Sequence, residues 1–141
     1  MQLNLSTDIA LRTLIYLGQK GESATIAEVA DAFGIVKTHL MKVVMTLVAQ
    51  GLVISVRGRN GGIRLARDPA TIRIGDVVQK MEPGMALVYC MRPDADETDC
   101  PLLPNCKLKK TFGKAQKAFL AALNESVLSD LLSNRPIRKK A

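Results

Sequence analysis

The feature that most constrains the fold is a pair of helical patterns separated by a single glycine. Apolar residues recur at helical spacing over residues 25–33, and again over residues 36–50 after the glycine. Thr25 and Glu28 have the spacing of a capping box, which marks the start of the first helix. Gly51 marks the end of the second. Two short helices joined by a glycine turn predict a helix-turn-helix unit.

The segment after residue 51 predicts a two-stranded hairpin. Residues 52–56 and 63–65 are rich in β-branched and apolar side chains, as strands are. Between them, Asn60-Gly61 indicates a hairpin turn in which both central residues take a positive φ. A hairpin with a basic, glycine-rich tip directly behind a helix-turn-helix unit is a wing. We therefore predict a mainly α fold with a small β-hairpin wing, a winged helix-turn-helix domain.

Two further helices complete this predicted domain. A helical pattern over residues 6–19 precedes the helix-turn-helix unit, and Ser6 or Thr7 is positioned to cap it. Another pattern over about residues 75–82 follows the hairpin and is stopped by a Pro-Gly pair. The winged domain is therefore predicted to span residues 1–83.

The rest of the chain predicts a loop, a long helix and a tail. Residues 84–106 have the composition of an irregular loop and carry all three cysteines. Residues 107–133 predict a long helix followed by a short final helix over 126–132. Residues 134–141 form a basic tail.

One face of the long helix carries a heptad-like apolar seam. Its members are Leu108, Phe112, Ala115, Phe119 and Ala122. A terminal helix of this length needs a partner to bury its two phenylalanines, so we predict a dimerisation helix and a homodimer. The alternative is that the seam packs on its own domain. A two-fold dimer would place two recognition helices on successive major grooves of a roughly palindromic DNA operator.

Positive charge is concentrated on the helix-turn-helix unit and the wing. The chain has 20 Lys+Arg against 13 Asp+Glu, a net charge of +7, and residues 36–73 hold seven basic residues and only one acid. Such a surface either promotes solubility or binds a polyanion. Because aromatic residues make up only 4% of the chain, a stacking platform for single strands is not supported. Double-stranded DNA is the better candidate, and the winged domain is predicted to bind it.

The predicted DNA contacts are polar and basic residues of the second helix and the wing. The helix over 36–50 places its apolar positions on one side and Thr38, His39 and Lys42 on the other. Side chains of these types bind base edges and phosphates in a major groove. The alternative is a solvated helix face beside an ordinary hairpin. The full predicted set is Lys37, Thr38, His39, Lys42, Arg57, Arg59, Asn60 and Gly61.

The three cysteines predict either a metal site or reactive thiols. Cys90, Cys100 and Cys106 are separated by nine and five residues, so the paired Cys-x-x-Cys spacing of zinc sites is absent. The spacing suits an iron–sulfur cluster, redox-active thiols or inert cysteines. A cubane cluster would need a fourth ligand, for which Asp8, the acids of residues 94–99 and water are candidates.

Membrane and enzyme functions lack sequence support. No apolar run reaches the ~20 residues of a membrane span, and the N-terminus lacks the features of a signal peptide. We therefore expect a cytoplasmic protein without a membrane partner, in which structural disulfides are not expected. No catalytic pairing of carboxylates and no Ser/His/Asp arrangement is evident, so we predict that the chain is not an enzyme.

Together these motifs resemble those of the small winged-helix repressors related to NsrR and IscR. The resemblance runs along essentially the whole chain. It is carried by Thr7-Asp8 and Ala10-Leu11-Arg12, by Gly34-Ile35, His39-Leu40 and Lys42-Val43, and by residues 56–65 and 72–78, with the three cysteines. The sequence VRGRNGGIRL at 56–65 is the most diagnostic part. The resemblance implies a DNA-binding transcriptional repressor that carries an iron–sulfur cluster.

Within this family the chain looks most similar to the nitric-oxide-sensing NsrR type. That resemblance implies a 4Fe–4S cluster, with 2Fe–2S as the alternative, on Cys90, Cys100 and Cys106. It also implies Asp8, supplied by the partner subunit, as the fourth ligand. IscR-type members have a histidine three positions after the third cysteine, where this chain has Lys109. The implied function is a homodimeric repressor that senses nitric oxide and releases its operator when the cluster is nitrosylated.

Two departures from the family pattern affect the predicted helices. Ile9 stands where an aromatic residue is usual, and Val36 stands where a capping serine is usual, so the recognition helix loses a cap. Two other function classes stay open. One is an IscR-like or peroxide-sensing regulator that responds through cluster loss or cysteine oxidation. The other is a small metalloprotein or electron carrier that does not bind DNA.

Overall fold

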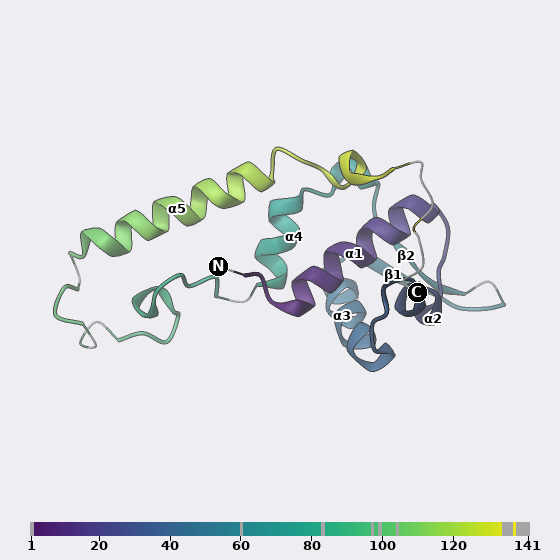
Figure 1. The fold of residues 1–141 in the computed structure, drawn as a ribbon, viewed down its shortest axis with the longest axis horizontal. Coiled ribbons are helices and arrows are strands. Elements are labelled where there is room, and N and C mark those ends of the chain that lie inside the picture. The colour runs from purple at the N-terminus through teal and green to yellow at the C-terminus, as the bar shows by residue number, and fades with distance from the viewer. Residues whose placement is uncertain are drawn as a thin grey trace.

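Figure 1 shows the computed structural model of the chain, which describes residues 2–59, 61–82, 84–96, 98, 100–103, 105–133 and 137. The α-helices in these residues are α1 (Leu5–Lys20), α2 (Ile26–Phe33), α3 (Lys37–Ala49), α4 (Ile74–Met81) and α5 (Lys107–Leu123). The strands are β1 (Val53–Val56) and β2 (Gly62–Leu65). Short 3₁₀ helices are η1 (Pro69–Thr71), η2 (Tyr89–Met91) and η4 (Leu128–Leu131). The predicted mainly α fold with one small hairpin is confirmed.

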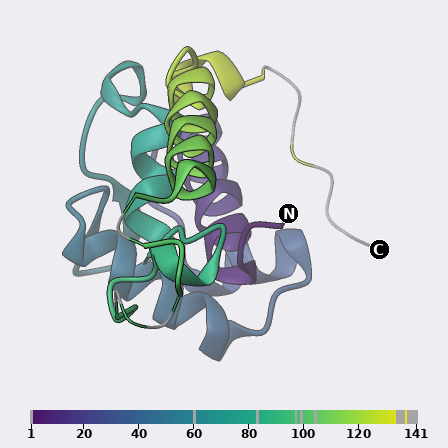
Figure 2. The same ribbon diagram turned by 90° about the vertical axis from the view of Figure 1, so that its left-hand side faces the viewer.

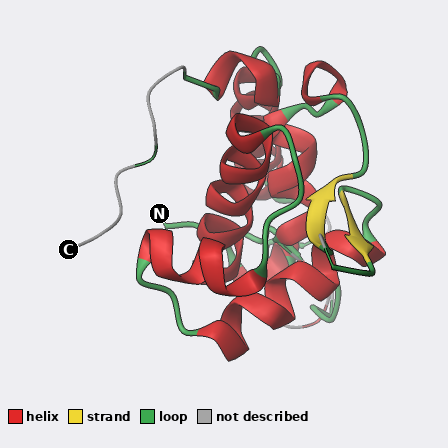
Figure 3. Ribbon diagram, turned by 90° about the vertical axis from the view of Figure 1, so that its right-hand side faces the viewer, coloured by secondary structure: helices red, strands yellow, loops and turns green. Residues whose placement is uncertain are grey.

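The N-terminal elements pack around one aliphatic core (Figure 3). Leu14 of α1, Val29 of α2 and Leu40 and Leu47 of α3 are fully buried, and Val53 extends the core into the hairpin. Each buried side chain of this size contributes about 1.5–3 kcal/mol of transfer free energy. This shared burial holds α3 at a defined angle to α1 and α2.

Local capping sets the starts of α1 and α2. Thr25 and Glu28 form the predicted capping box at the start of α2. The predicted cap of α1 is wrong: the Asn4 side chain, rather than Ser6 or Thr7, accepts a hydrogen bond from the Thr7 N–H at 2.8 Å. Asparagine is among the best capping residues, so the helix begins earlier than predicted. Ser6 and Thr7 therefore lie within the first turn and contact other elements.

The wing is the predicted antiparallel hairpin, but its tip differs. Strand pairing leaves residues 57–61 in the loop, so the connection is longer than a two-residue turn. Positive φ angles occur at Gly58 (108°) and Gly62 (150°) and not at Gly61. The predicted turn geometry is therefore wrong for Gly61, and Asn60 lies outside the described residues. Among the described residues of this longer connection, the positive φ angles thus fall on Gly58 and Gly62, where glycine has no Cβ penalty.

Gly62 attaches the wing to the helical core. The backbone groups of Ala24 and Ile63 exchange two hydrogen bonds with N···O distances of 2.8 and 2.9 Å. A Cβ atom at Gly62 would collide with the Ala24 carbonyl group. The glycine thus allows a close backbone approach as well as a positive φ.

Helix α4 joins the winged domain to α5. A Cβ atom at Gly75 would lie 2.5 Å from the Leu120 carbonyl oxygen, so α4 packs closely against the end of α5. The Asn124 side chain accepts a hydrogen bond from the Asp76 N–H and donates one to the Asp76 carboxylate, both at 3.0 Å. From this junction α5 projects away from the domain, as Figures 1 and 2 show.

The segment after α5 returns to the winged domain. Val127 forms a β-bridge with Arg73, and the Leu128 N–H donates a hydrogen bond to the Ile72 carbonyl at 2.8 Å. The short final helix predicted over 126–132 is present as the shorter 3₁₀ helix η4, because this pairing holds residue 127 extended. Of the predicted basic tail, only residue 137 lies among the described residues.

No single helix in the described part of the chain is long and apolar enough to cross a membrane. Helices α2 and α3 meet that criterion only when taken together, and they are bent by 118° relative to each other.

Candidate functional site

Helix α3 presents a polar and basic side to solvent. Leu40 and Leu47 anchor the buried side, whereas Thr38 and Lys42 are exposed on the opposite side, as predicted. Lys37 is exposed at the first position of the helix. The free N–H groups at a helix start favour a phosphate, and a lysine there adds to that effect. The start is otherwise weakly capped, because the side chain of the capping residue forms no hydrogen bond.

His39 lies at the edge of this side rather than at its centre. It is half-buried, and its Nε2 atom is 3.4 Å from the Ser6 hydroxyl of α1. The sequence prediction treated His39 as a freely exposed DNA contact. The structure instead makes it part of the contact between α1 and α3, with only part of its side chain exposed to solvent.

The wing adds exposed positive charge beside α3. Arg57 and Arg59 are exposed on the loop, and Gly61 is half-buried. In the described residues the ion pairs join Arg12 to Asp8 and Lys20 to Glu28, so the basic residues of α3 and the wing are not neutralised within the chain. Unneutralised lysines and arginines on a helix and an adjacent loop suit the phosphates of duplex DNA.

The sequence prediction missed an apolar component of this surface. Met41, Met45 and Val48 are 51%, 70% and 41% exposed. They border a groove of about 470 Å³ between α3 and the wing. The groove is lined by Ile26, Met41, Val44, Met45, Val48, Ala49, Ser55 and Ile63. The signal was available in the sequence, because Met45 lies three residues after Lys42 and shares its side of the helix.

The cysteine-bearing segment holds three free thiols. Cys90 in η2 and Cys100 are half-buried, and Cys106 is buried. Cys106 is the capping residue of α5, and its sulfur accepts a hydrogen bond from the Lys109 N–H at 3.4 Å. This placement agrees with the predicted start of the long helix.

The structure does not bring the three thiols together. In the described residues no group of three or more His, Cys, Asp or Glu side chains is placed to hold a metal ion. The donor set nevertheless fits a cluster in its chemistry, because three free cysteines lie in one segment and the buried one caps a helix. Closure of the segment 84–106 around a cluster would have to gather them.

Two of the acidic candidates for a fourth ligand already have partners. The Asp8 carboxylate is 2.8 Å from the guanidinium of Arg12, one turn along α1. Asp96 accepts hydrogen bonds from the backbone and the hydroxyl of Thr98, both at 2.8 Å. These hydrogen bonds lower the pKa of Asp96. Glu97 and Asp99 lie outside the described residues.

Comparison with known families decides the class of protein. The Rrf2 family model, described as an iron-dependent transcriptional regulator, matches residues 3–134. The chain belongs to the Rrf2 family. It is therefore a DNA-binding transcriptional regulator, in agreement with the predicted winged domain, and members of this family are regulators rather than enzymes.

Solved structures of other regulators share this Rrf2 fold. IscR of T. potens is 22% identical, with a TM-score of 0.70, over 93% of this chain and 85% of that chain. CymR (YrzC) of B. subtilis, the global cysteine regulator, is 21% identical, with a TM-score of 0.72, over 96% of this chain and 99% of that chain. The oxidized form of Staphylococcus aureus CymR is 21% identical, with a TM-score of 0.71, over 96% of this chain and 99% of that chain. At these identities the likeness shows the fold.

In this Rrf2-family chain, Glu82 links the cysteine-bearing segment to the start of α1. Its carboxylate accepts hydrogen bonds from the Asn4 N–H at 2.8 Å, the Asn4 side-chain amide at 2.9 Å and the Thr7 hydroxyl at 2.6 Å. The segment that carries the cysteines begins two residues later. Through Ser6, the same turn of α1 contacts His39 of α3. A short series of contacts therefore joins the segment to the recognition helix.

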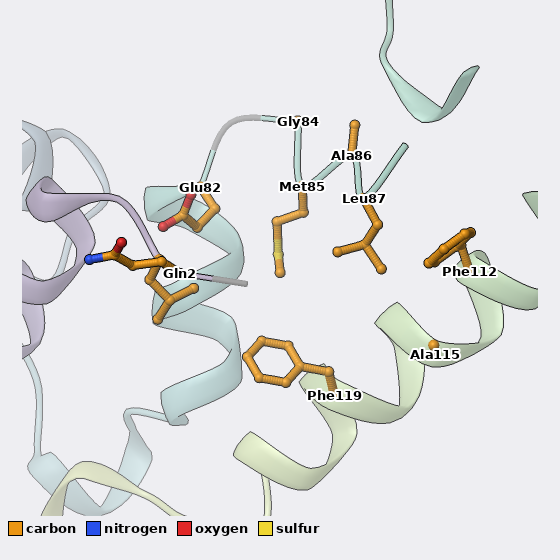
Figure 4. Close-up of a pocket in the computed structure, with 10 residues that line it drawn as sticks. Gln2, Glu82, Gly84, Met85, Ala86, Leu87, Phe112, Ala115 and Phe119 are labelled. Carbon is orange, nitrogen blue, oxygen red and sulfur yellow. The ribbon is translucent and has the colours of Figure 1, made fainter. Parts of the chain in front are cut away.

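The apolar seam of α5 is only partly covered in the Rrf2-family chain. Figure 4 shows Met85 and Leu87 directed toward the face of α5 that carries Phe112 and Phe119. They border a cavity of about 590 Å³. Leu108, at the far end of the seam, is 56% exposed. The chain's own loop thus covers part of the seam and leaves the rest accessible.

Proposed function

We propose that this Rrf2-family chain is a homodimeric repressor whose operator binding depends on an iron–sulfur cluster and ends on exposure to nitric oxide. The observation that carries the proposal is the placement of three free cysteines between the DNA-binding domain and the long helix α5. Cys90, Cys100 and Cys106 would hold the cluster, 4Fe–4S in preference to 2Fe–2S. When bound, the cluster supplies iron atoms with which nitric oxide reacts.

The proposed DNA-binding surface combines α3 and the wing. Lys37, Thr38 and Lys42 enter a major groove, and Arg57 and Arg59 bind the flanking backbone or the minor groove. His39 contributes its solvent-facing edge. Asn60 and Gly61, at the tip of the wing, follow the backbone. This proposal is supported by the exposure of the charged residues and by their lack of acidic partners among the described residues.

The proposed dimer uses the accessible part of the α5 seam. Leu108, Ala115 and Ala122 are exposed, and Phe112 and Phe119 are half-buried. A second copy would cover them around a two-fold axis, since cyclic two-fold dimers are the commonest closed assembly. The two α3 helices would then bind successive major grooves, about 34–36 Å apart, of a roughly palindromic operator.

The chain's own contacts suggest how the state of the cysteine-bearing segment reaches the DNA. Ordering of this segment would fix Glu82, which holds the first turn of α1 through Asn4 and Thr7. The same turn contacts His39 through Ser6. When the segment relaxes, these contacts loosen and the spacing of the two recognition helices changes. Operator affinity falls by the free energy that separates the two states.

Asp8 is the proposed fourth ligand, provided by the partner subunit. Its carboxylate must first leave Arg12, and this costs little because the pair is half-exposed. Asp8→Asn is expected to change the visible absorbance of the loaded protein, since an oxygen ligand to iron is lost. The check is anaerobic absorbance of the variant against the wild type. An unchanged spectrum and an unchanged response to nitric oxide would remove Asp8 from the ligand set.

The decisive experiment uses Cys100→Ala with Thr98→Ala as a matched control from the same segment. The operator is first obtained by selection from a random duplex library with the anaerobically purified full chain. Absorbance, native mass spectrometry and operator binding are then measured before and after nitric oxide. We expect Cys100→Ala to lose the cluster and operator affinity together, whereas Thr98→Ala keeps both. A Cys100→Ala variant that binds as tightly as the loaded protein would overturn the switch.

A thiol switch without a cluster is the second candidate function. It is favoured by the observation that the three thiols are free and are not gathered in the described structure. One similar structure is named as the oxidized form of CymR. Here a peroxide would oxidise two thiols to a disulfide and would itself be reduced to two waters. A colourless, metal-free protein that binds the operator and releases it on disulfide formation would establish this alternative.

A further inference from the structure

Helix α3 carries a line of exposed apolar side chains that the proposed polar contacts do not use. Met41, Met45 and Val48, here called the methionine strip, are spaced four and three residues apart, so they share one side of the helix. Met45 is 70% exposed, more than any core-facing role allows. Such exposure on a rigid helix is unfavourable in water and indicates a surface that a ligand covers.

The strip borders the polar residues that are proposed to bind DNA. Met45 lies one turn from Lys42 and within about 20° of the helix direction of Thr38, on the outermost line of α3. On its other side the groove of about 470 Å³ separates it from Ser55 and Ile63 of the wing. The strip thus lies on the side of α3 that borders the groove toward the wing, where a docked duplex would pass.

Charge identifies duplex DNA as the occupant of this surface. The ionisable residues from position 36 to 67, apart from the half-buried histidine, are Lys37, Lys42, Arg57, Arg59, Arg64 and Arg67. No acid lies among them. An apolar strip flanked by these basic residues of α3 and the wing fits a ligand that is anionic at its edges and presents apolar groups between them. Duplex DNA has this arrangement, with phosphates on both sides of a groove.

In the major groove the apolar group available to a side chain is the C5-methyl of thymine. We propose that Met45 packs against a thymine methyl group in each half-site, with Met41 and Val48 extending the apolar contact. The inference rests on the proposed DNA-binding function and deepens it, because it names a base that the protein recognises. A methionine suits the role because its flexible thioether adapts to the position of a methyl group. A·T pairs opposite Met45 are therefore expected in both halves of the operator.

Replacing thymine by uracil tests this contact, because uracil keeps the base pair and removes only the methyl group. The probe is the operator selected from the random duplex library, with each thymine replaced in turn. For the wild-type protein, affinity is expected to fall about fourfold at one position in each half-site, as burial of one methyl group implies. With both positions replaced, the loss is expected to be about 15-fold.

The variant Met45→Ala separates this contact from other effects of the base change. It is expected to show less than a twofold penalty for uracil at the same positions, while keeping the wild-type penalties elsewhere. Met45→Gln retains side-chain length and helix propensity. It replaces the alanine variant in the same uracil test if that variant folds poorly. Met91→Ala, a half-buried methionine in η2, is the control and should keep the full uracil penalty.

Two results would overturn the inference while leaving the proposed function intact. One is a wild-type protein that binds thymine and uracil operators equally at every position, or a selected operator without thymine in its half-sites. The other is a Met45→Ala variant with the same uracil penalty as the wild type. Either would leave the groove for a protein partner. If selection enriches no operator at all, the DNA-binding proposal itself fails and the inference fails with it.

Discussion

Residues 5–82 and residues 84–123 differ in how their apolar side chains are covered. In the first region, helices α1 to α4 and the hairpin bury a shared aliphatic core. Among the described residues of the second region, Cys106 alone is buried, and α5 itself buries none. The winged domain therefore buries its core within one chain, whereas the described residues of the cysteine-bearing segment and α5 leave most of their apolar side chains accessible. This division suits the proposed function, in which a rigid part binds DNA and the order of a second part depends on a signal.

The largest difference between the regions is expected from truncating one leucine in each. Leu40→Ala removes a fully buried side chain of α3 and is expected to cost about 3 kcal/mol of unfolding free energy. Leu108→Ala truncates a side chain that is 56% exposed on α5, and is expected to cost less than about 0.5 kcal/mol in dilute solution. Urea unfolding of both variants measures the contrast. Equal costs would mean that α5 is as well packed as the core.

A smaller effect is expected at Glu82, at the end of the first region and two residues before the second. Glu82→Ala removes a carboxylate that accepts hydrogen bonds from Asn4 and Thr7, and is expected to cost about 2 kcal/mol. Glu125→Ala, an exposed acid beyond α5, is the control and should cost little. Operator affinity of the Glu82 variant should fall as well, since the first turn of α1 also contacts α3. Loss of stability with unchanged operator affinity would show that Glu82 does not couple the regions.

The smallest effect on the unfolding free energy is expected from lowering the pH, and it arises at Glu28 of the winged domain. The hydrogen bond from Lys20, then that from the Thr25 backbone, lowers the pKa of Glu28 to about 2. Because the folded pKa is depressed, this carboxylate stabilises the fold above its ordinary pKa near 4.5, and the contribution is lost as the pH falls toward 2. Glu28→Gln should cost about 0.5 kcal/mol at pH 7, since the pair is exposed. Urea unfolding should show that the difference in unfolding free energy between Glu28→Gln and wild type vanishes near pH 2. A difference that stays constant with pH would contradict this role of Glu28.

Local sequence signals predicted most of the winged domain. The capping box at Thr25, the glycine between α2 and α3 and the start of α5 at Cys106 agree with the structure. Each depends on residues within four positions of one another, so the sequence contains all of its determinants. The exposed positions of Thr38 and Lys42 followed in the same way from the periodicity of one helix.

The errors occur where distant residues meet. The short final helix predicted over 126–132 is shortened to η4, because residues 127 and 128 pair with the backbone of residues 73 and 72, which no local pattern encodes. His39 is partly occupied by Ser6, 33 residues earlier in the chain. The exposure of Met45 depends on which side of α3 packs against the core. From the sequence, an apolar methionine was not assigned to the DNA-binding surface.

By itself, the sequence determined most of the helices and strands of this protein, the basic residues of α3 and the wing, and the three thiols available to a cofactor. Only the tertiary structure decided which of them meet: Glu82 with Thr7, 75 residues apart, Gly62 with Ala24, and the methionine strip beside the wing. The physical reason is the distance along the chain over which each interaction acts. Helix periodicity and capping act within a few residues, whereas these contacts exist only after burial of the shared core has brought separate elements together.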